Sequence, residues 1–277
     1  MILIADSGST KTDWRLCSES AAPLSFQTIG LNPFFLSPEE MRQLLSETFA
    51  DYLDAVTEIY FYGAGCVPAK IPMMEDLFRQ LFTHATVFVA SDLLGAARAV
   101  CGREPGIACI LGTGSNSCYY DGNDIVGNVS PLGFILGDEG SGAVMGRLLV
   151  ADYLKHQMPE ELRADFAERY DIVPTEVIER VYRQASPNRY LANFARFIAF
   201  HTDHPYIQQL VESQFLAFFR RNIMQYPQHK DLAISFIGSV AYYLGDNLAA
   251  AATTLGLKIG TVVQSPIEGL CRFHTAE

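Results

Sequence analysis

Short apolar runs alternate with amphipathic stretches through the first third of the chain. A continuous apolar run bounded by turn residues is typical of a buried strand, and apolar residues recurring every three or four positions are typical of a helix. The sequence predicts strands over residues 2–5, 12–17, 58–63 and 86–92, and helices over residues 37–53, 72–82 and 93–100. The first of these helices begins with Ser37 as N-cap, Pro38 in its first turn and Glu40 at the capping-box position. Such alternation of strands and helices indicates an α/β domain with a largely parallel central sheet.

The same pattern begins again at Ile107. Residues 107–129 predict a strand, a glycine loop, a second strand, a glycine turn and a third strand, and residues 143–225 are mainly helical. The remaining elements are strands over residues 232–237 and 258–266 and helices over residues 242–257 and 267–273. When Gly8 is aligned with Gly114, Ser9 falls on Ser115, so each half opens with a hairpin of one design. The sequence therefore predicts two α/β domains.

Charge and composition exclude several classes of protein. The chain of 277 residues has a formal net charge of −11 and no cluster of Lys and Arg, which argues against nucleic-acid binding. No run reaches the roughly 18 apolar residues of a membrane span. An early Asp6 and the lack of a basic region argue against a secretory signal. The six cysteines include no C-x-x-C pair and resemble reduced thiols, so we expect a cytoplasmic enzyme.

The loop "DSGSTKT" is the first candidate for chemistry. A tight hairpin turns successive backbone N–H groups toward one point, and a glycine lets an anion approach them. The donors of this loop that we expect to bind phosphate are Ser7, Gly8, Ser9, Thr10 and Lys11. Asp6 would repel a phosphate unless Mg²⁺ lay between them, so we assign Asp6 to that metal. The alternative interpretation is a glycine-containing turn beside a solvated Asp6.

A second loop, "GTGSNS" at residues 112–117, repeats these small donors without the carboxylate. It lacks the last glycine of G-x-G-x-x-G and leads into a strand, which argues against a Rossmann dinucleotide site. A tight turn explains either loop alone. Two such hairpins that face each other could hold a polyphosphate between them.

Asp92 follows a strand and begins a helix, where open α/β sheets bind their ligands. A carboxylate at this point could take the proton of an alcohol during phosphoryl transfer. The alternative is that Ser91 or Asp92 only caps the helix.

Three further positions could contact a ligand. Asp138, in the glycine-rich stretch "GFILGDEGSGAVMG", could accept hydrogen bonds from sugar hydroxyls, although the glycines could equally serve helix packing. Asn32 could bind a hydroxyl or hold the turn before Pro33. Gly238 and Ser239 could form a flat turn beside an adenine ring, or a plain turn between a strand and a helix.

Eight motifs together resemble the N-acetylglucosamine kinase and BadF/BadG/BcrA/BcrD-type ATPase family, within the actin, Hsp70 and sugar-kinase superfamily. In order along the chain, from Asp6 to Gly269, they are "DSGSTKTDW", "GLNP", "FYGAGC", "SDLLGAARA", "ILGTGSNS", "GDEGSGAVMG", "FIGSVA" and "SPIEG". The resemblance implies two ribonuclease-H-like domains, residues 1–112 and residues 113–265 with a helical insertion, and a ligand cleft between them. It also implies that residues 266–277 form a helix packed back on the first domain.

The resemblance further implies roles for single residues. Mg·ATP would contact the hairpin that begins at Asp6 and the turn formed by Thr113, Gly114 and Ser115, and adenosine would lie near Gly238 and Ser239. Asp92 would be the catalytic base. The contacts to an amino sugar would be Asn32, Asn116 and Asp138. Hinge closure on the ligand and a homodimer are also implied.

The function that the resemblance implies is ATP-dependent phosphorylation of an amino sugar, namely of N-acetylglucosamine to its 6-phosphate. One alternative is an ATPase that couples hydrolysis to a conformational change of a partner protein. Another is a non-catalytic sensor of sugar or nucleotide. The cysteines that hold an iron–sulfur cluster in the activator ATPases of the broad family have no counterpart here, which favours a kinase.

Overall fold

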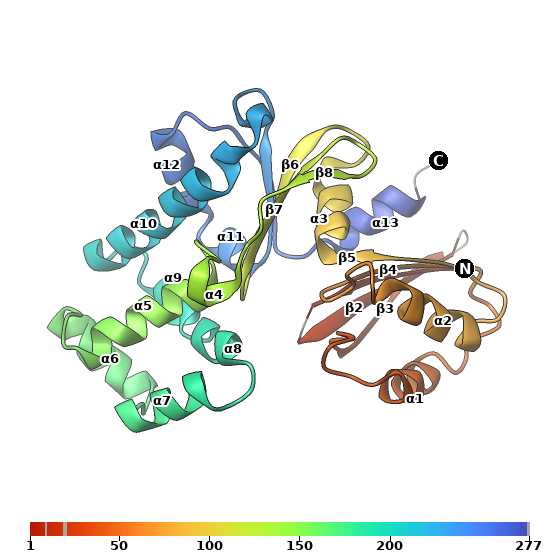
Figure 1. Cartoon of the computed structure of the whole chain (residues 1–277), viewed down its shortest axis with the longest axis horizontal. Coiled ribbons are helices and arrows are strands. Elements are labelled where there is room, and N and C mark those ends of the chain that lie inside the picture. Colours follow the sequence, from red (N-terminus) through yellow and green to blue (C-terminus); the bar gives the residue numbers. More distant parts are fainter. Residues whose placement is uncertain (9, 19–20, 276–277) are drawn as a thin grey trace. The chain divides into compact units, whose positions relative to one another are not determined.

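The computed structural model describes residues 1–8, 10–18 and 21–275. The chain forms two compact units (Figure 1). Unit 1 comprises residues 1–104, 122–124 and 265–277, and unit 2 comprises residues 105–121 and 125–264. The first stretch of unit 1 ends at Glu104 rather than at 112, because the next strand pairs within unit 2. No helix in the described part of the chain is long and apolar enough to cross a membrane.

A mixed sheet of five strands organises unit 1, in the order β3-β2-β1-β4-β5. Its strands are β1 (Ile2–Ser7), β2 (Lys11–Ser18), β3 (Ala21–Ile29), β4 (Glu58–Gly63) and β5 (Thr86–Ser91). Strands β1, β4 and β5 run parallel, as the alternating pattern predicts, whereas β2 and β3 run antiparallel. Strand β3 was not predicted, because this edge strand is mostly exposed and therefore lacks an apolar run.

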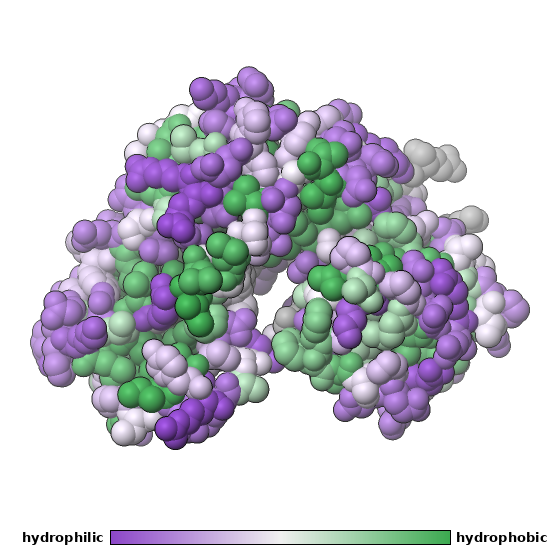
Figure 2. Space-filling view, viewed as in Figure 1, coloured by the Kyte–Doolittle hydropathy of each residue, from purple (hydrophilic) through white to green (hydrophobic). Residues whose placement is uncertain are grey.

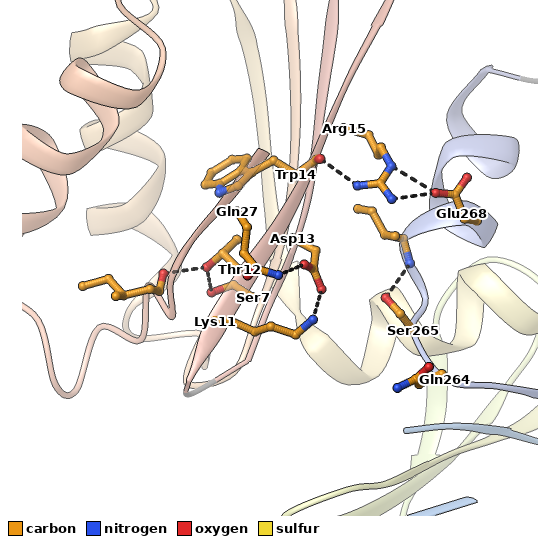
Figure 3. Close-up of polar contacts among 12 residues, drawn as sticks. Ser7, Lys11, Thr12, Asp13, Trp14, Arg15, Gln27, Gln264, Ser265 and Glu268 are labelled. Carbon is orange, nitrogen blue, oxygen red and sulfur yellow. Dashed lines mark hydrogen bonds and ion pairs between the residues drawn. The ribbon is translucent and has the colours of Figure 1, made fainter. Parts of the chain in front are cut away.

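Helices cover both faces of this sheet. Helix α1 (Pro38–Thr48) begins with the predicted capping box of Ser37 and Glu40 and packs with α2 (Ile71–Leu81). Their apolar faces enclose an aromatic core around Trp14, which is fully buried. Side chains alternate along a strand, so Arg15 points to the opposite face, where it pairs with Glu268 (Figure 3). Helix α13 (Ile267–Thr275) lies on that face beside α3 (Asp92–Cys101).

Unit 2 repeats this topology. Its sheet has the order β10-β9-β6-β7-β8. The strands are β6 (Gly106–Leu111), β7 (Ser115–Tyr120), β8 (Ile125–Asn128), β9 (Ile234–Ile237) and β10 (Ile259–Val263). Strands β6, β7 and β8 form an antiparallel meander, and β9 and β10 continue parallel to β6, as β4 and β5 continue from β1. The second hairpin therefore opens a second domain of the same design, as predicted.

The helical segment of unit 2 lies between β8 and β9. It contains α4 (Gly133–Leu136), α5 (Gly142–Leu154), α6 (Glu160–Arg169), α7 (Pro174–Tyr182), α8 (Pro187–Ala192), α9 (Ala195–Phe200), α10 (Pro205–Arg221) and two 3₁₀ turns, Ile223–Gln225 and Pro227–Lys230. The single helix predicted over residues 242–257 is wrong. The chain forms α11 (Ser239–Tyr243) and α12 (Gly245–Thr254), separated at Leu244, whose backbone leaves the helical region just before a glycine.

Helix α13 is attached to the sheet of unit 1 by a half-buried aromatic contact near its end. The ring of His274 stacks on Tyr60 with centroids 3.6 Å apart, and Nε2 of His274 lies 2.8 Å from the hydroxyl of Tyr62. Burial and the nearby charges of Arg98 and Arg103 lower the pKa of His274 to about 4.

This pKa predicts that the ring of His274 contributes a loss of stability to unit 1 in acid. The unfolded chain binds the His274 proton near pH 6.5, and the folded chain binds it only near pH 4, so the free energy of unfolding falls as pH falls through that range. After allowance for the partial exposure of the ring, we expect a loss of about 1 kcal/mol that His274→Gln abolishes. Urea unfolding at pH 7 and pH 4.5 measures it, because Trp14, the only tryptophan, reports unit 1. An equal pH dependence in both proteins would contradict the prediction.

Candidate functional site

The carboxyl ends of the parallel strands of unit 1 bring two predicted carboxylates to one edge. Ser7 on β1, Gly63 on β4 and Ser91 on β5 lie in one row across the sheet. Asp6 precedes this row and Asp92 follows it. Burial, followed by the negative charge of Asp92, raises the pKa of Asp6 to about 7. The two carboxylates are therefore close enough to interact, at the edge where such sheets bind ligands.

Asp92 is not the cap of its helix. The N-cap of α3 is Ser91, whose hydroxyl accepts a hydrogen bond from the N–H of Leu94 at 3.3 Å. The carboxylate of Asp92 accepts a bond from the N–H of Leu93 at 2.9 Å. Burial raises the pKa of Asp92, and this N–H bond opposes the shift. A half-buried carboxylate that the helix does not need as its cap remains available for chemistry.

The hairpin between β1 and β2 is tight, with the N–H of Gly8 donating to the carbonyl of Lys11 at 2.9 Å. The side chain of Lys11 is 57% exposed, and its ammonium lies 2.7 Å from the carboxylate of Asp13, which also accepts a bond from Gln27 (Figure 3). Thr10 is exposed, and Ser9 lies outside the described residues. Asp13, which the sequence analysis did not single out, thus holds the cation of this loop.

Ser7 differs from the other predicted donors. Its side chain is fully buried, and its hydroxyl lies 2.8 Å from that of Thr12 and accepts a bond from the N–H of Leu31 at 3.0 Å. The structure thus engages Ser7 inside the unit rather than toward solvent.

Asn32 is buried in the loop that follows β3. Its Oδ1 accepts a bond from the N–H of Phe34 at 3.0 Å. Gly65 packs on its amide with a positive φ of 82°, and a Cβ at that position would lie 2.5 Å from Oδ1. Only glycine accommodates this approach. The signal that could have identified Gly65 is the pair of glycines, Gly63 and Gly65, at the end of β4.

The turn at residues 112–114 of unit 2 is held from two sides. At the start of α5, the N–H groups of Gly142 and Ala143 donate to the carbonyls of Gly112 and Thr113 at 2.8 and 3.0 Å. On the other side lies Gly238, with a φ of 120°, where a Cβ would collide with the carbonyl of Leu111. The unit 2 residues expected near phosphate and adenosine therefore belong to adjoining turns, with Ser239 at the start of α11.

Asp138 lies against the same turn. Its carboxylate accepts a bond from the N–H of Ser115 at 3.4 Å, and a Cβ on Gly114 would lie 3.1 Å from its Oδ2. Burial, with a smaller contribution from the charge of Glu139, raises the pKa of Asp138 to about 6. Glu139 itself pairs with Arg221 and accepts a bond from Asn222, which ties the glycine-rich loop to the end of α10.

Two other parts of unit 2 near these candidate residues are the apolar surface at α4 and the side chain of Asn116. Figure 2 shows hydrophobic residues gathered on the surface over α4, where Leu132, Ile135 and Leu136 are exposed. Asn116 lies on β7 with its Oδ1 toward β8, where it accepts a bond from Asn128 at 3.1 Å. The structure thus places Asp138 beside Gly114 and Ser115, and engages Asn116 with β8.

The ligands that unit 1 offers to a divalent cation are carboxylates. In the part of the chain that the structure describes, no group of three or more His, Cys, Asp or Glu side chains could hold a metal by itself. Besides burial, the negative charges of Asp92 and Asp13 raise the pKa of Asp6, and the smaller opposing effect of Lys11 does not cancel them. Such a site fits Mg²⁺, which is commonly held by one or two carboxylates together with phosphates and water.

We expect Gly238→Ala to destabilise unit 2. The new Cβ would strain the positive φ and displace the carbonyl of Leu111, at a cost of about 3 kcal/mol. Calorimetry of the whole chain and hydrogen exchange of the β6 and β9 amides would detect the loss. Gly245→Ala is the matched control, because nothing lies near its Cβ and alanine favours a helix. Equal stability of the two variants would contradict the prediction.

Solved structures of other proteins match the fold of this chain over nearly its whole length. The chain is 48% identical to the putative N-acetylglucosamine kinase from Porphyromonas gingivalis, with a TM-score of 0.94, covering 99% of this chain and 98% of that chain. A putative N-acetylglucosamine kinase from Chromobacterium violaceum is 17% identical with a TM-score of 0.64, covering 98% of each chain. A ROK family glucokinase from Streptomyces griseus, in complex with glucose and AMPPNP, is 16% identical with a TM-score of 0.56, covering 97% of each chain. No family model and no curated protein sequence matches the chain.

Proposed function

The chain belongs to the N-acetylglucosamine kinase and BadF/BadG-type ATPase family of the sugar-kinase superfamily, and from this premise we propose that it phosphorylates an amino sugar with ATP. The acceptor we propose is N-acetylglucosamine, and the group that reacts is its 6-hydroxyl.

The observation that supports this proposal most is that the parallel strands bring Asp6 and Asp92 to the same carboxyl edge of unit 1, beside the row of Ser7, Gly63 and Ser91. Phosphoryl transfer to an alcohol requires charge neutralisation at the phosphates and a carboxylate beside the acceptor. Two carboxylates with separate local environments can divide these roles, because Asp92 alone begins a helix and accepts an N–H bond there.

Asp92 acts as the general base in the reaction we propose. The sugar oxygen attacks the γ-phosphorus of ATP, the bond from that phosphorus to the bridging oxygen of ADP breaks, and the hydroxyl proton passes to Asp92. Burial raises the pKa of this carboxyl, which makes its carboxylate a stronger base at neutral pH.

The two hairpins bind the polyphosphate in this proposal. Backbone N–H groups near Gly8 and Gly114 and the ammonium of Lys11 donate to its oxygens, and Lys11 leaves Asp13 to do so. Asp6 would hold Mg²⁺, which neutralises charge on the phosphates when bound. Gly238 and Ser239 lie beside the adenosine.

Asn32, Asn116 and Asp138 contact the sugar in this proposal. A carboxylate with two oxygens suits neighbouring hydroxyls, and an amide can both donate and accept. Because the pKa of Asp138 is about 6, this group accepts hydrogen bonds from hydroxyls at pH 7.5 and loses that capacity as the pH falls below 6.

We also propose that the protein acts as a homodimer, which sedimentation would test.

A coupled assay of ADP release over a panel of hexoses and N-acetylhexosamines tests the proposal. We expect ADP release that depends on N-acetylglucosamine and on Mg²⁺, with a product that carries phosphate at O6 by NMR. ATP consumption that no sugar stimulates would contradict it and favour an ATPase that acts on a partner. Ligand binding without any ADP release would favour a sensor.

A further inference from the structure

Two buried hydroxyls link the β1–β2 hairpin to the loop that carries Asn32. Ser7 ends β1 and Thr12 lies opposite it on β2, and both side chains are fully buried. Their hydroxyl oxygens lie 2.8 Å apart (Figure 3). The N–H of Leu31, the residue before Asn32, donates to Ser7 at 3.0 Å and to Thr12 at 3.3 Å.

The direction of these hydrogen bonds follows from the number of protons. The hydroxyl of Thr12 donates to the carbonyl of Ile29 at 3.1 Å, and a carbonyl can only accept. The single proton of Thr12 is therefore used, so Ser7 must donate its own proton to Thr12. The chain of bonds runs from the N–H of Leu31 through Ser7 and Thr12 to the carbonyl of Ile29. Ser7 has no proton left for a phosphate while this chain is intact.

We propose that Ser7 and Thr12 are positioning residues that fix the 29–32 segment, and with it Asn32, relative to the phosphate-binding hairpin. This inference rests on the proposed function for its kinetic consequence. The segment has a further attachment to the hairpin, because the N–H of Gly30 donates to the carbonyl of Thr10 at 3.1 Å. Gly65 then confines the amide of Asn32 from the other side. Loss of the hydroxyl pair would displace Asn32 more than the hairpin, whose own pairing between β1 and β2 remains.

The test compares Thr12→Val, which removes a hydroxyl at constant shape, with Thr12→Ser, which keeps it. We expect Thr12→Val to raise the KM for the sugar about tenfold, as the loss of one buried hydrogen bond implies, and to leave the KM for ATP within about twofold. Thr12→Ser should restore the sugar KM. Ser7→Ala should resemble Thr12→Val, and the double variant should fall short of the product of the two effects, because both act on one chain of bonds.

Thr28→Val is the matched control. The hydroxyl of Thr28 donates to the same carbonyl of Ile29 at 3.1 Å and accepts a bond from Nε1 of Trp14 at 3.0 Å, so calorimetry measures the stability of this variant. The N–H of Leu31 donates to Ser7 and Thr12 instead. We therefore expect its sugar KM to equal that of the wild type. A purely structural role of Thr12 would lower stability, seen in Trp14 fluorescence, without separating the two KM values. That result, or a folded Thr12→Val with unchanged KM values, would overturn the inference.

Hydrogen exchange at Leu31 separates this inference from the proposed function. If the wild type phosphorylates no sugar, the proposed function fails, and the amide of Leu31 still reports the bond chain. Faster exchange at Leu31 in Ser7→Ala and Thr12→Val than in Thr12→Ser would then support the positioning pair. Equal exchange in all three variants would overturn it.

Discussion

Asp92→Asn is expected to lower sugar phosphorylation by a factor of about 10² to 10⁴, the usual contribution of a general base. Asparagine has the shape of aspartate and can still accept the bond from the N–H of Leu93, so α3 keeps its first turn. The amide cannot accept the proton of the sugar hydroxyl. The effect should therefore fall on kcat, while the dissociation constants for sugar and ATP change by less than about threefold.

The matched control for this variant is Ser91→Ala. It removes the cap of α3, which costs about 1 kcal/mol of stability, but leaves the carboxylate in place. Single-turnover kinetics and calorimetric titration with sugar should show normal chemistry in Ser91→Ala and slow chemistry with normal binding in Asp92→Asn. Turnover near that of the wild type in Asp92→Asn would exclude it as the base. Loss of sugar binding would instead assign it to recognition.

The order of strands and helices could be predicted where burial shapes the sequence. Residues 2–5 are apolar because β1 lies inside the sheet, and residues 87–90 are apolar because β5, although at the edge of the sheet, packs against α2 and α3. The start of α1 has a capping box that is visible in the sequence. Strand β3 has no such signature, since among the described residues its backbone pairs with β2 alone and most of its side chains are exposed. An exposed edge strand is specified by its neighbour rather than by its own pattern.

The residues of the candidate site were predictable by type but not by environment. The sequence places Asp6 and Asp92 after strands, and the parallel order of β1, β4 and β5 brings them to one edge. It also indicates that Ser7 and Thr12 flank a hairpin. Both hydroxyls are buried and accept a bond from the N–H of Leu31. This contact depends on the path of the chain after β3, the strand that the sequence pattern does not reveal. The partner of Lys11 on β2 was missed because an Asp two residues away has no distinctive pattern.

Asp6→Asn should separate activity from stability, because Asp6 holds a charge that the folded chain disfavours. Its pKa is raised from 3.8 to about 7. Below pH 3.8 the carboxyl is protonated in both the folded and the unfolded chain. As the pH rises from 3.8 to 7, the unfolded chain loses this proton more readily than the folded chain, so the free energy of unfolding falls. At pH 8 a neutral amide should therefore stabilise unit 1 by about 2 kcal/mol, and the gain should vanish near pH 4. The same change removes the proposed Mg²⁺ ligand, and we expect kcat/KM to fall by roughly 10²-fold or more.

Urea unfolding followed by Trp14 fluorescence at pH 8 and pH 4 measures this difference, and the ADP-release assay with varied Mg²⁺ measures the loss. Asp76→Asn removes an exposed carboxylate of α2 and should change neither quantity. An Asp6→Asn protein that is less stable at pH 8 would mean that the carboxylate makes favourable contacts outweighing its burial. An Asp6→Asn protein that retains activity at low Mg²⁺ would show that Asp6 is not a ligand of the metal. A more stable but inactive protein is the expected result, since a carboxylate that ligand binding requires is costly to bury without the ligand.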